Sequence, residues 1–287
     1  MHYLTRDKWQ LAQEQHQLIV TNWVSPRLSR RSLGHKHPVD DFMFEYYPIS
    51  AKKLKTWHPG FQFSLETLPG DENDFPETTY RATAEISVNL DWLESQQEAI
   101  GAEIEFLTAT AQRSARTGCF GLHEWAMVLG QDEVRHNDWP LRIPQTQIAK
   151  TIEDVGLRCT HFDAFRFFTE QARPLNPLQL IRTDQLEVEQ PGCLHANMDL
   201  YKIAMRWVPI LGSLLARQSF RLARDIRTVD MQSAPYDLLA LGVQPIKIET
   251  PEGRLIFTQK QKVFSERAQV LRAKMIGLLE ESVYVLR

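Results

Sequence analysis

The sequence predicts a mainly helical globular domain with one small β-hairpin near its C-terminus. Apolar residues recur at intervals of three and four along several long segments, as they do on the buried face of a helix. The chain has 287 residues, of which 43% are hydrophobic and 24% charged, so it can bury a substantial core. We expect a single domain over residues 1–287, in which an N-terminal helix and an aromatic and basic segment (1–80) pack on a helical core (89–287).

The N-terminal elements are predicted from their caps and breakers. Thr5 can cap a first amphipathic helix, which Pro26 is expected to interrupt. Residues 57–76 are rich in Pro and Gly and predict an irregular connection, with a short strand at 62–65.

Similar signals place the middle of the chain. Asn89 can cap a long helix that ends at Gly118, and a shorter helix is expected over 122–129. Asp163 can cap a phenylalanine-rich helix that Pro174 stops.

The C-terminal third is predicted to contain three more helices and the hairpin. Helices are expected over 197–207 and from 209 to about 225. Residues 243–258 alternate apolar and polar around a Pro-Glu-Gly turn, which is typical of a β-hairpin, and a long amphipathic helix follows from Lys262.

Composition limits the classes of partner. With 33 Lys and Arg against 36 Asp and Glu, the net charge is −3, whereas nucleic-acid binders usually carry a basic excess. No apolar run approaches the roughly 18 to 20 residues of a membrane span, and the first residues lack a signal core. Three cysteines without a CxxC spacing predict reduced thiols. We therefore expect a cytoplasmic protein with no membrane partner.

The segment from Gln190 to Lys202 is the strongest candidate for the centre of a site. If a helix begins near Asn197, the side chains of His195, Asp199 and Lys202 fall on nearly one azimuth. An imidazole, a carboxylate and an ammonium on one stripe cost desolvation energy unless they pair, so such a stripe indicates a buried network or a site.

Other polar clusters stand beside aromatic segments and could join it. They are His123-Glu124, Glu133 with His136, His161-x-Asp163-x-x-Arg166, and Asp225-x-Arg227-x-x-Asp230. We expect some of these side chains to be partly buried, and we weigh their convergence on one pocket against local capping and surface pairing.

Metal and cofactor motifs are incomplete. Glu133-x-x-His136 has the spacing used by helical di-iron proteins, but the second such motif is missing, and Lys202 would repel a cation from the His195 stripe. A mononuclear site drawn from His123, His136, His161 and His195 remains an alternative. The sequence predicts no metal and no cofactor, because the glycine-rich nucleotide motifs are also absent.

Nucleophile motifs are equally weak. The chain has no Gly-x-Ser-x-Gly elbow, and only Cys159 and Cys193 have a histidine two residues downstream. Short-range pairs of this kind often arise by chance.

Motifs spread over almost the whole chain carry a family resemblance. They are Lys36–Phe42, Tyr46-Tyr47, Trp57–Gly60, Leu122–Val128, His161–Phe168, Pro191–Lys202, and Asp225–Arg227 with Pro235–Leu238. Together they resemble bacterial proteins labelled 3-methyladenine DNA glycosylase. The chain lacks the helix-hairpin-helix motif of the well-described helical glycosylases.

The resemblance implies DNA repair by hydrolysis of the glycosidic bond of an alkylated purine. Such an enzyme must extrude the base, stack it on aromatic rings and stabilise the developing sugar cation. Asp199 or Asp230 would activate water or stabilise that cation, and His195 would relay a proton.

The resemblance also implies substrate-binding and phosphate-binding residues. Tyr46, Tyr47, Trp57 and Trp125 would sandwich the base, and Arg27, Arg30, Arg31, Lys36, Lys52 and Lys53 would contact phosphates. The remaining expected pocket residues are His123, Glu124, His161, Asp163, Arg166, Asn197, Tyr201, Lys202, Asp225, Arg227 and Tyr236.

Three alternatives stay open. An N-glycosidase acting on a small nucleoside or modified base would need no basic footprint, which suits the negative net charge. A metal-dependent helical oxidase or hydrolase would contain bound metal. A non-catalytic small-molecule-binding protein would keep its ligand after Asp199→Asn or His195→Ala.

Overall fold

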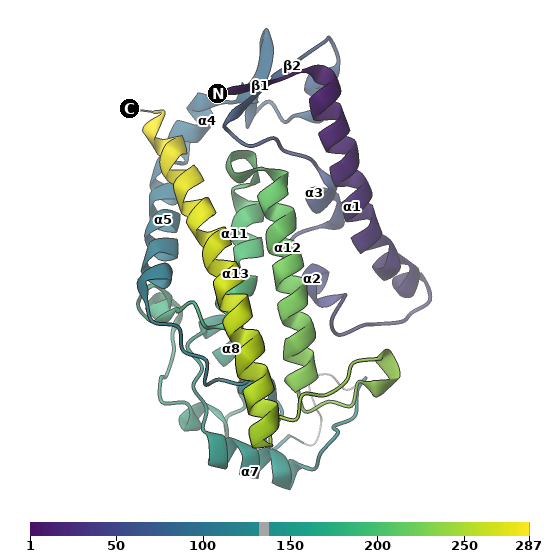
Figure 1. The fold of residues 1–287 in the computed structure, drawn as a ribbon, viewed down its shortest axis with the longest axis vertical. Coiled ribbons are helices and arrows are strands. Elements are labelled where there is room, and N and C mark those ends of the chain that lie inside the picture. The colour runs from purple at the N-terminus through teal and green to yellow at the C-terminus, as the bar shows by residue number, and fades with distance from the viewer. Residues whose placement is uncertain (132–137, 287) are drawn as a thin grey trace. The chain divides into compact units, whose positions relative to one another are not determined.

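The computed structural model describes residues 1–131 and 138–286, and the prediction of a mainly helical chain is confirmed (Figure 1). The chain divides into two compact units. Unit 1 comprises Met1–Thr108, Leu200–Arg221 and Val270–Arg287, and unit 2 comprises Ala109–Asp199 and Leu222–Gln269. The expectation of a single domain stays a prediction. None of the helices in the described ranges combines the length and the apolar character that a membrane crossing needs.

The elements follow one another along the chain with short connections. Unit 1 contains β1 (His2–Leu4), α1 (Arg6–Ser32), α2 (Phe42–Glu45), α3 (Ala51–Lys55), β2 (Phe63–Glu66), η1 (Asp71–Asp74), β3 (Tyr80–Ala82), β4 (Glu85–Val88), α4 (Leu90–Ser95) and α11 (Leu200–Arg206). Unit 2 contains α6 (Leu122–Ala126), α7 (Gln145–Val155), α8 (Phe162–Phe165), η2 (Arg173–Leu175), η3 (Arg182–Asp184), α9 (Gln185–Val188), α10 (Leu194–Met198) and η4 (Leu239–Leu241). Three helices run from one unit into the other: α5 (Gln97–Gln112), α12 (Val208–Ser233) and α13 (Pro251–Tyr284).

The β structure of the described residues is a four-stranded sheet in unit 1, in the order β1-β2-β4-β3. β1 pairs with β2 in parallel, and the other two pairings are antiparallel. Leu65 of β2 lies opposite Ile86 of β4, and both side chains are buried. The strand predicted at 62–65 is confirmed as β2.

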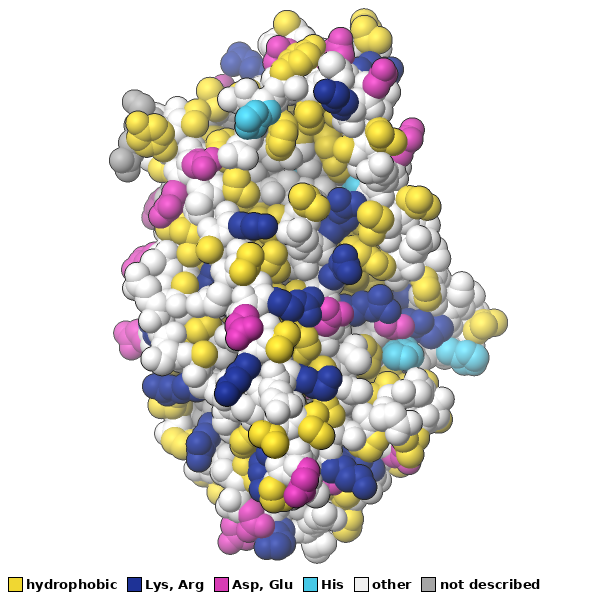
Figure 2. Space-filling model, in the orientation of Figure 1, with side chains coloured by type: hydrophobic (Ala, Val, Ile, Leu, Met, Phe, Trp, Pro, Cys, Tyr) yellow, Lys and Arg dark blue, Asp and Glu magenta, His cyan; other side chains and the backbone are white. Residues whose placement is uncertain are grey.

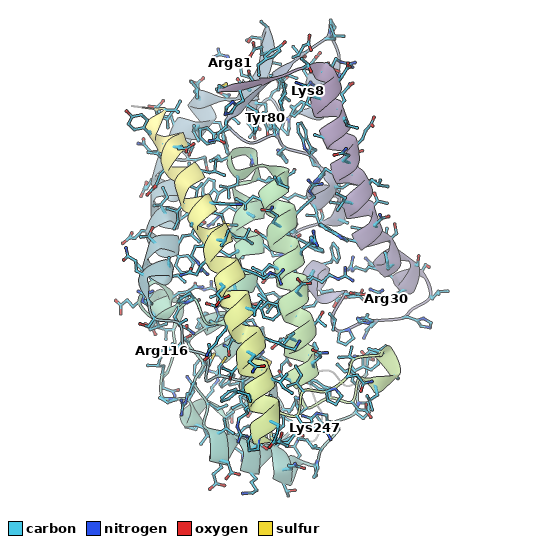
Figure 3. All side chains as sticks on the ribbon, viewed as in Figure 1. Lys8, Arg30, Tyr80, Arg81, Arg116 and Lys247 are labelled. Atoms are coloured by element: carbon cyan, nitrogen blue, oxygen red, sulfur yellow. The ribbon has the colours of Figure 1, made fainter. Side chains whose placement is uncertain are left out.

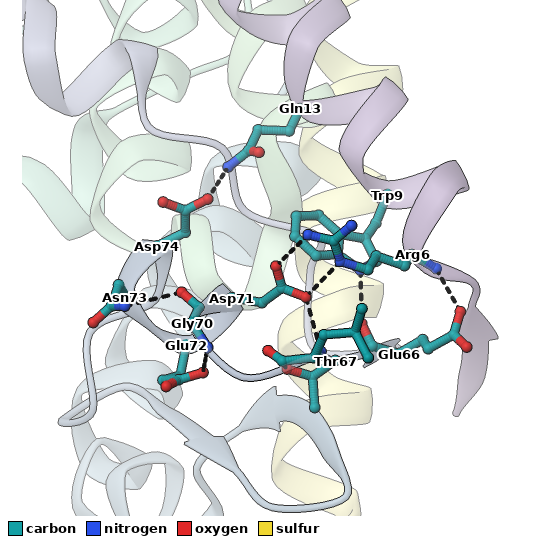
Figure 4. Close-up of polar contacts among 11 residues, drawn as sticks. Arg6, Trp9, Gln13, Glu66, Thr67, Gly70, Asp71, Glu72, Asn73 and Asp74 are labelled. Atoms are coloured by element: carbon teal, nitrogen blue, oxygen red, sulfur yellow. Dashed lines mark hydrogen bonds and ion pairs between the residues drawn. The ribbon is translucent and has the colours of Figure 1, made fainter.

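Polar contacts join the start of α1 to the segment after β2 (Figure 4). The Arg6 guanidinium donates to both carboxylate oxygens of Asp71 at 2.7 and 2.8 Å, and the Trp9 indole N–H donates to the Glu66 carbonyl at 2.9 Å. The Glu66 carboxylate also accepts from the Arg6 backbone N–H, so it serves the helix terminus in place of the Thr5 hydroxyl. The Trp9 ring stacks on Trp57, with centroids 6.2 Å apart.

The prediction that Pro26 interrupts the first helix is wrong, because α1 continues to Ser32. A proline removes one backbone hydrogen bond, but contacts on either side of it hold the helix together. Val20 and Val24 are buried before it. After it, the Arg30 guanidinium pairs with Asp41 at 2.5 Å.

The predicted hairpin over 243–258 is also wrong, since the sheet lies within residues 2–88 and the chain from Pro251 onward is the first turns of α13. Thr250 Oγ1 accepts from the Gly253 N–H at 3.1 Å, and Pro251 takes the first helical position, where its missing N–H costs nothing. A cap and an N-terminal proline therefore outweigh the local alternation. The last helix begins eleven residues before Lys262.

Other helix boundaries moved by a few residues. Asn89 does cap a helix, through Asp91 N–H at 3.0 Å, but that helix ends at Ser95 and α5 follows. The residue at the N-cap of α8 is His161, with Asp163 inside the first turn. The helix expected over 209–225 extends to Ser233 as α12.

Candidate metal centre

Unit 2 brings together side chains from four of the sequence clusters. Its α6 carries His123 and Glu124, the residue before α8 is His161, α10 carries His195, and α12 carries Arg227 and Asp230. These side chains are buried although they are polar or charged. Burial of this kind requires mutual pairing or a bound ion.

The first group is an ion-pair network between α6 and α12. Arg227 donates to Glu124 Oε1 and to Asp230 Oδ2, both at 2.7 Å. The other Asp230 oxygen, Oδ1, lies 3.0 Å from His123 Nε2. Burial alone would lower the pKa of His123, but the Asp230 carboxylate raises it overall. Burial would likewise raise the pKa of Asp230, and the neighbouring His123 and Arg227 hold it well below its usual range.

The second group surrounds His161. Its Nδ1 lies 2.8 Å from Glu189 Oε2, and its Nε2 lies 3.9 Å from Asp199 Oδ2. Burial disfavours the imidazolium, but Glu189 and then Asp199 overcome this and raise the pKa of His161 to about 9. Within the described residues, neither His161 Nε2 nor Glu189 Oε1 has a hydrogen-bond partner. Two buried polar atoms are therefore left unsatisfied.

His195 lies between the two groups. Its ring meets His123 edge to face at 4.4 Å between centroids, and it stacks on His161 at 5.1 Å. Burial, followed by the two neighbouring imidazoles, holds the pKa of His195 well below its usual value. The imidazole is therefore neutral at pH 7 and has a free lone pair on one ring nitrogen.

Three overlapping sets of donor atoms have the spacing of metal ligands. They are His123, His195 and Asp230; His161, Glu189 and Cys193; and His161, Asp163 and Asp199, and within each set the donor atoms lie within 4.8 Å of one another. Imidazole and carboxylate donors suit Zn²⁺, Mn²⁺, Fe²⁺ or Co²⁺.

The charge balance also suits a cation. The buried carboxylates of Glu124, Glu189, Asp199 and Asp230 face the Arg227 guanidinium and the two imidazoles with raised pKa, His123 and His161. Negative charge is in excess even when both of these imidazoles are protonated. Asp163 is paired separately with Arg166 and Arg182, at 3.3 and 3.5 Å.

A small cavity of about 20 Å³ borders His123 and His195. That space accepts one water molecule or ion. Its other lining residues include Cys119, Cys159 and Cys193. Burial raises the pKa of all three thiols, that of Cys159 to about 12, so neither Cys-His pair in the sequence is an activated nucleophile.

The segment that carries His195 is held by backbone contacts. Gln190 Oε1 accepts from the N–H groups of Arg116 and Gly192 at 2.8 and 2.7 Å, and Asn197 Nδ2 donates to the Pro191 carbonyl at 2.9 Å. A side chain at Gly192 would place a Cβ 2.5 Å from the Arg116 carbonyl oxygen. This glycine is required for the close approach.

The stripe predicted over His195, Asp199 and Lys202 is not one helix face. α10 begins at Leu194, before Asn197, and ends at its C-cap Asp199, whereas Lys202 is exposed on α11 in unit 1. A continuous azimuth cannot pass through the break. The expected repulsion between Lys202 and a bound cation therefore rested on a helix that does not form.

The residues expected to stack on a base lie in packed surroundings. Trp125 is fully buried and donates its indole N–H to the Ser233 carbonyl at 2.8 Å. In unit 1, Tyr47 packs edge to face on Tyr201 at 5.5 Å, and Trp57 stacks on Trp9. Tyr46 is half-buried in unit 1, and Tyr236 is buried in unit 2. Their base-binding roles stay predictions.

The remaining predicted contacts are nearer the surface. Asp225 forms an exposed ion pair with Arg267 at 2.7 Å. In unit 1, Arg27 lies over the Phe44 ring, and Arg30 pairs with Asp40 and Asp41, while Arg31, Lys36, Lys52 and Lys53 are exposed. On the face drawn in Figure 2, acidic side chains stand among the basic ones. Their phosphate-binding role also stays a prediction.

Two further residues complete the comparison with the sequence. Glu133 and His136 lie outside the described residues. Sequence reasoning missed Glu189, which pairs with His161. Its position directly before the Gln190-Pro191-Gly192 turn was the available signal.

Comparisons of the chain with protein families, with curated proteins and with solved structures find no match. The resemblance to the glycosylase-labelled family stays a prediction.

Proposed function

We propose that this protein is a metal-dependent hydrolase whose centre is the buried histidine and carboxylate cluster of unit 2. The observation that carries the proposal is the convergence of His123, His161 and His195, from three separate segments, on four buried carboxylates. An excess of buried negative charge and unsatisfied donor atoms are the features that a bound divalent cation relieves.

The set of His123, His195 and Asp230 is the best candidate for the ligands, because its two histidines border the ion-sized cavity. When bound, a divalent ion would supply Lewis acidity and make a water molecule more acidic. Arg227 would hold the Asp230 carboxylate in place from behind, as outer-shell partners of metal ligands do. Asp199 is available to accept a proton from the reacting water.

Metal titration tests this proposal directly. We expect purified protein supplied with Co²⁺ to bind about one ion per chain and to develop a visible absorption band. His195→Ala and His123→Ala should abolish the band. His35→Ala, which removes an exposed histidine of unit 1, should keep it. Absence of bound metal in the wild-type protein would overturn the proposal.

Metal-independent N-glycosidase chemistry is the second candidate. It is favoured by the neutral His195 imidazole, which can take a proton from water, and by Asp199 at the end of the same short helix. The assay is release of alkyladenine from alkylated DNA and from alkylated nucleosides, before and after removal of metal by chelation. Release that survives chelation and is lost in Asp199→Asn supports this candidate, and absence of release from both substrates rejects it.

A further inference from the structure

A second hollow of about 440 Å³ adjoins the ion-sized cavity within unit 2. Both spaces are lined by Cys119, Arg158, Cys159 and Thr160, so they meet at these four residues. The hollow extends from there to Arg116, Thr117, Gly118, Pro177 and Leu178. Its volume suits a small molecule, whereas the inner cavity holds only a water molecule or ion.

The lining of this hollow is positively charged. Arg116 and Arg158 both border it, and no carboxylate does. Within the part of the chain that the structure describes, neither guanidinium has an ion-pair partner, in contrast to Arg142, which pairs with Glu249 at 2.5 Å. Two unneutralised guanidiniums at one concave surface form an anion-attracting site.

The backbone positions of both arginines are fixed by the segments that build the metal centre. The Arg116 N–H donates to Gln190 Oε1 at 2.8 Å, and the Arg116 carbonyl accepts from Gln190 Nε2 at 3.3 Å (Arg116 is labelled in Figure 3). Arg158 precedes Cys159, whose backbone N–H and carbonyl both bond to the Asn176 amide, at 2.7 and 3.1 Å. The hollow is therefore a built part of the site.

A phosphate group matches this lining better than a carboxylate does. A phosphate monoester carries a charge of about −1.5 to −2 at pH 7 and three acceptor oxygens. Two guanidiniums match that charge and bind its oxygens in planar, paired hydrogen bonds. Thr117 and Thr160 add hydroxyl donors to the same wall.

We propose that the substrate is a small molecule carrying a phosphate group, which Arg116 and Arg158 bind in this hollow while the rest of the molecule reaches the cavity beside His123 and His195. The phosphate serves as a binding handle, since the arginines border the outer hollow and the histidines border only the inner cavity. This assignment rests on the proposed function, because it names the substrate class of the same site.

Titration of the metal-free protein with inorganic phosphate tests the assignment at low ionic strength, by calorimetry. We expect measurable binding to the wild type and affinity about tenfold weaker in each of Arg116→Gln and Arg158→Gln. Arg158→Lys should fall between, because it keeps the charge and loses the planar fork. Arg267→Gln, a matched loss of positive charge elsewhere in unit 2, should bind as the wild type does.

Acetate distinguishes a carboxylate site from a phosphate site, and it should bind at least about tenfold more weakly than phosphate. Equal phosphate affinity in all four variants would overturn the assignment, as would acetate binding as tight as that of phosphate. Thermal unfolding of each variant shows whether its fold is intact. Because no metal is present in this titration, failure of phosphate binding and failure of metal binding are separate results.

Discussion

Arg227 is the charged side chain on which the α6–α12 ion-pair network depends. It is 1% exposed and touches two carboxylates, Glu124 and Asp230, that have little access to water. Replacing it with an apolar residue leaves both carboxylates buried without their cation. The cost of breaking a buried ion pair from one side is larger than the net contribution of the intact pair.

Arg227→Met should therefore lower the free energy of unfolding by about 3–5 kcal/mol. Urea denaturation of the two proteins measures this difference. Arg267→Met, which breaks an exposed ion pair on the same unit, should cost less than about 1 kcal/mol. Equal losses in the two variants would contradict the account.

Two buried histidines of unit 1 make stability depend on pH. Burial, with Arg217 nearby, lowers the pKa of His16 to about 4, and burial, with His16 and Lys53 nearby, lowers that of His58 to about 4. His16 bonds to the Leu54 carbonyl, and His58 to the Tyr80 hydroxyl. The ordinary value of 6.5 applies to both in the unfolded chain. Between these two values the unfolded state binds more protons than the folded state.

The free energy of unfolding should therefore be fully present above pH 6.5 and fall as the pH drops toward 4, by up to about 3 kcal/mol for each histidine. Urea denaturation at a series of pH values measures the slope. His16→Gln and His58→Gln should flatten it, whereas His35→Gln, at an exposed position, should not. A slope unchanged in the first two variants would refute the assignment.

At the scale of elements, α13 shows how a tertiary contact decides where a helix can start. Its first turn approaches residue 247 so closely that a Cβ on Gly253 would overlap the Lys247 carbonyl oxygen. Gly277, on the same helix, has nothing within 4 Å of its Cβ position. The same residue type is therefore required at one position and replaceable at the other.

Gly253→Ala should destabilise the protein by about 1–3 kcal/mol, because the backbone must shift to admit the methyl group. Gly277→Ala should stabilise it by about 0.5–1 kcal/mol through helix propensity. Thermal or urea unfolding of the two variants gives both signs. Stabilisation by both substitutions would show that the approach to Lys247 is not restrictive.

At the scale of the whole molecule, local signals predicted the helical class, the strand at β2, and the caps at Asn89 and at the start of α1. They failed where a cap overrode an alternating pattern, at Thr250 before α13, and where flanking contacts carried a helix through Pro26. Boundaries that depend on distant residues, such as the Glu66 carboxylate at the start of α1, have no local signature.

The sequence by itself determined the helical character and the polar residues that could do chemistry, because periodicity and side-chain type are local properties. Only the tertiary structure decided which of those residues meet. His123, His161 and His195 are separated by 38 and 34 residues in the sequence, and their rings come together because buried imidazoles and carboxylates must pair inside unit 2. The same packing puts Arg116 and Arg158 on one hollow, and it separates Lys202 from the helix of His195 because that helix ends at Asp199.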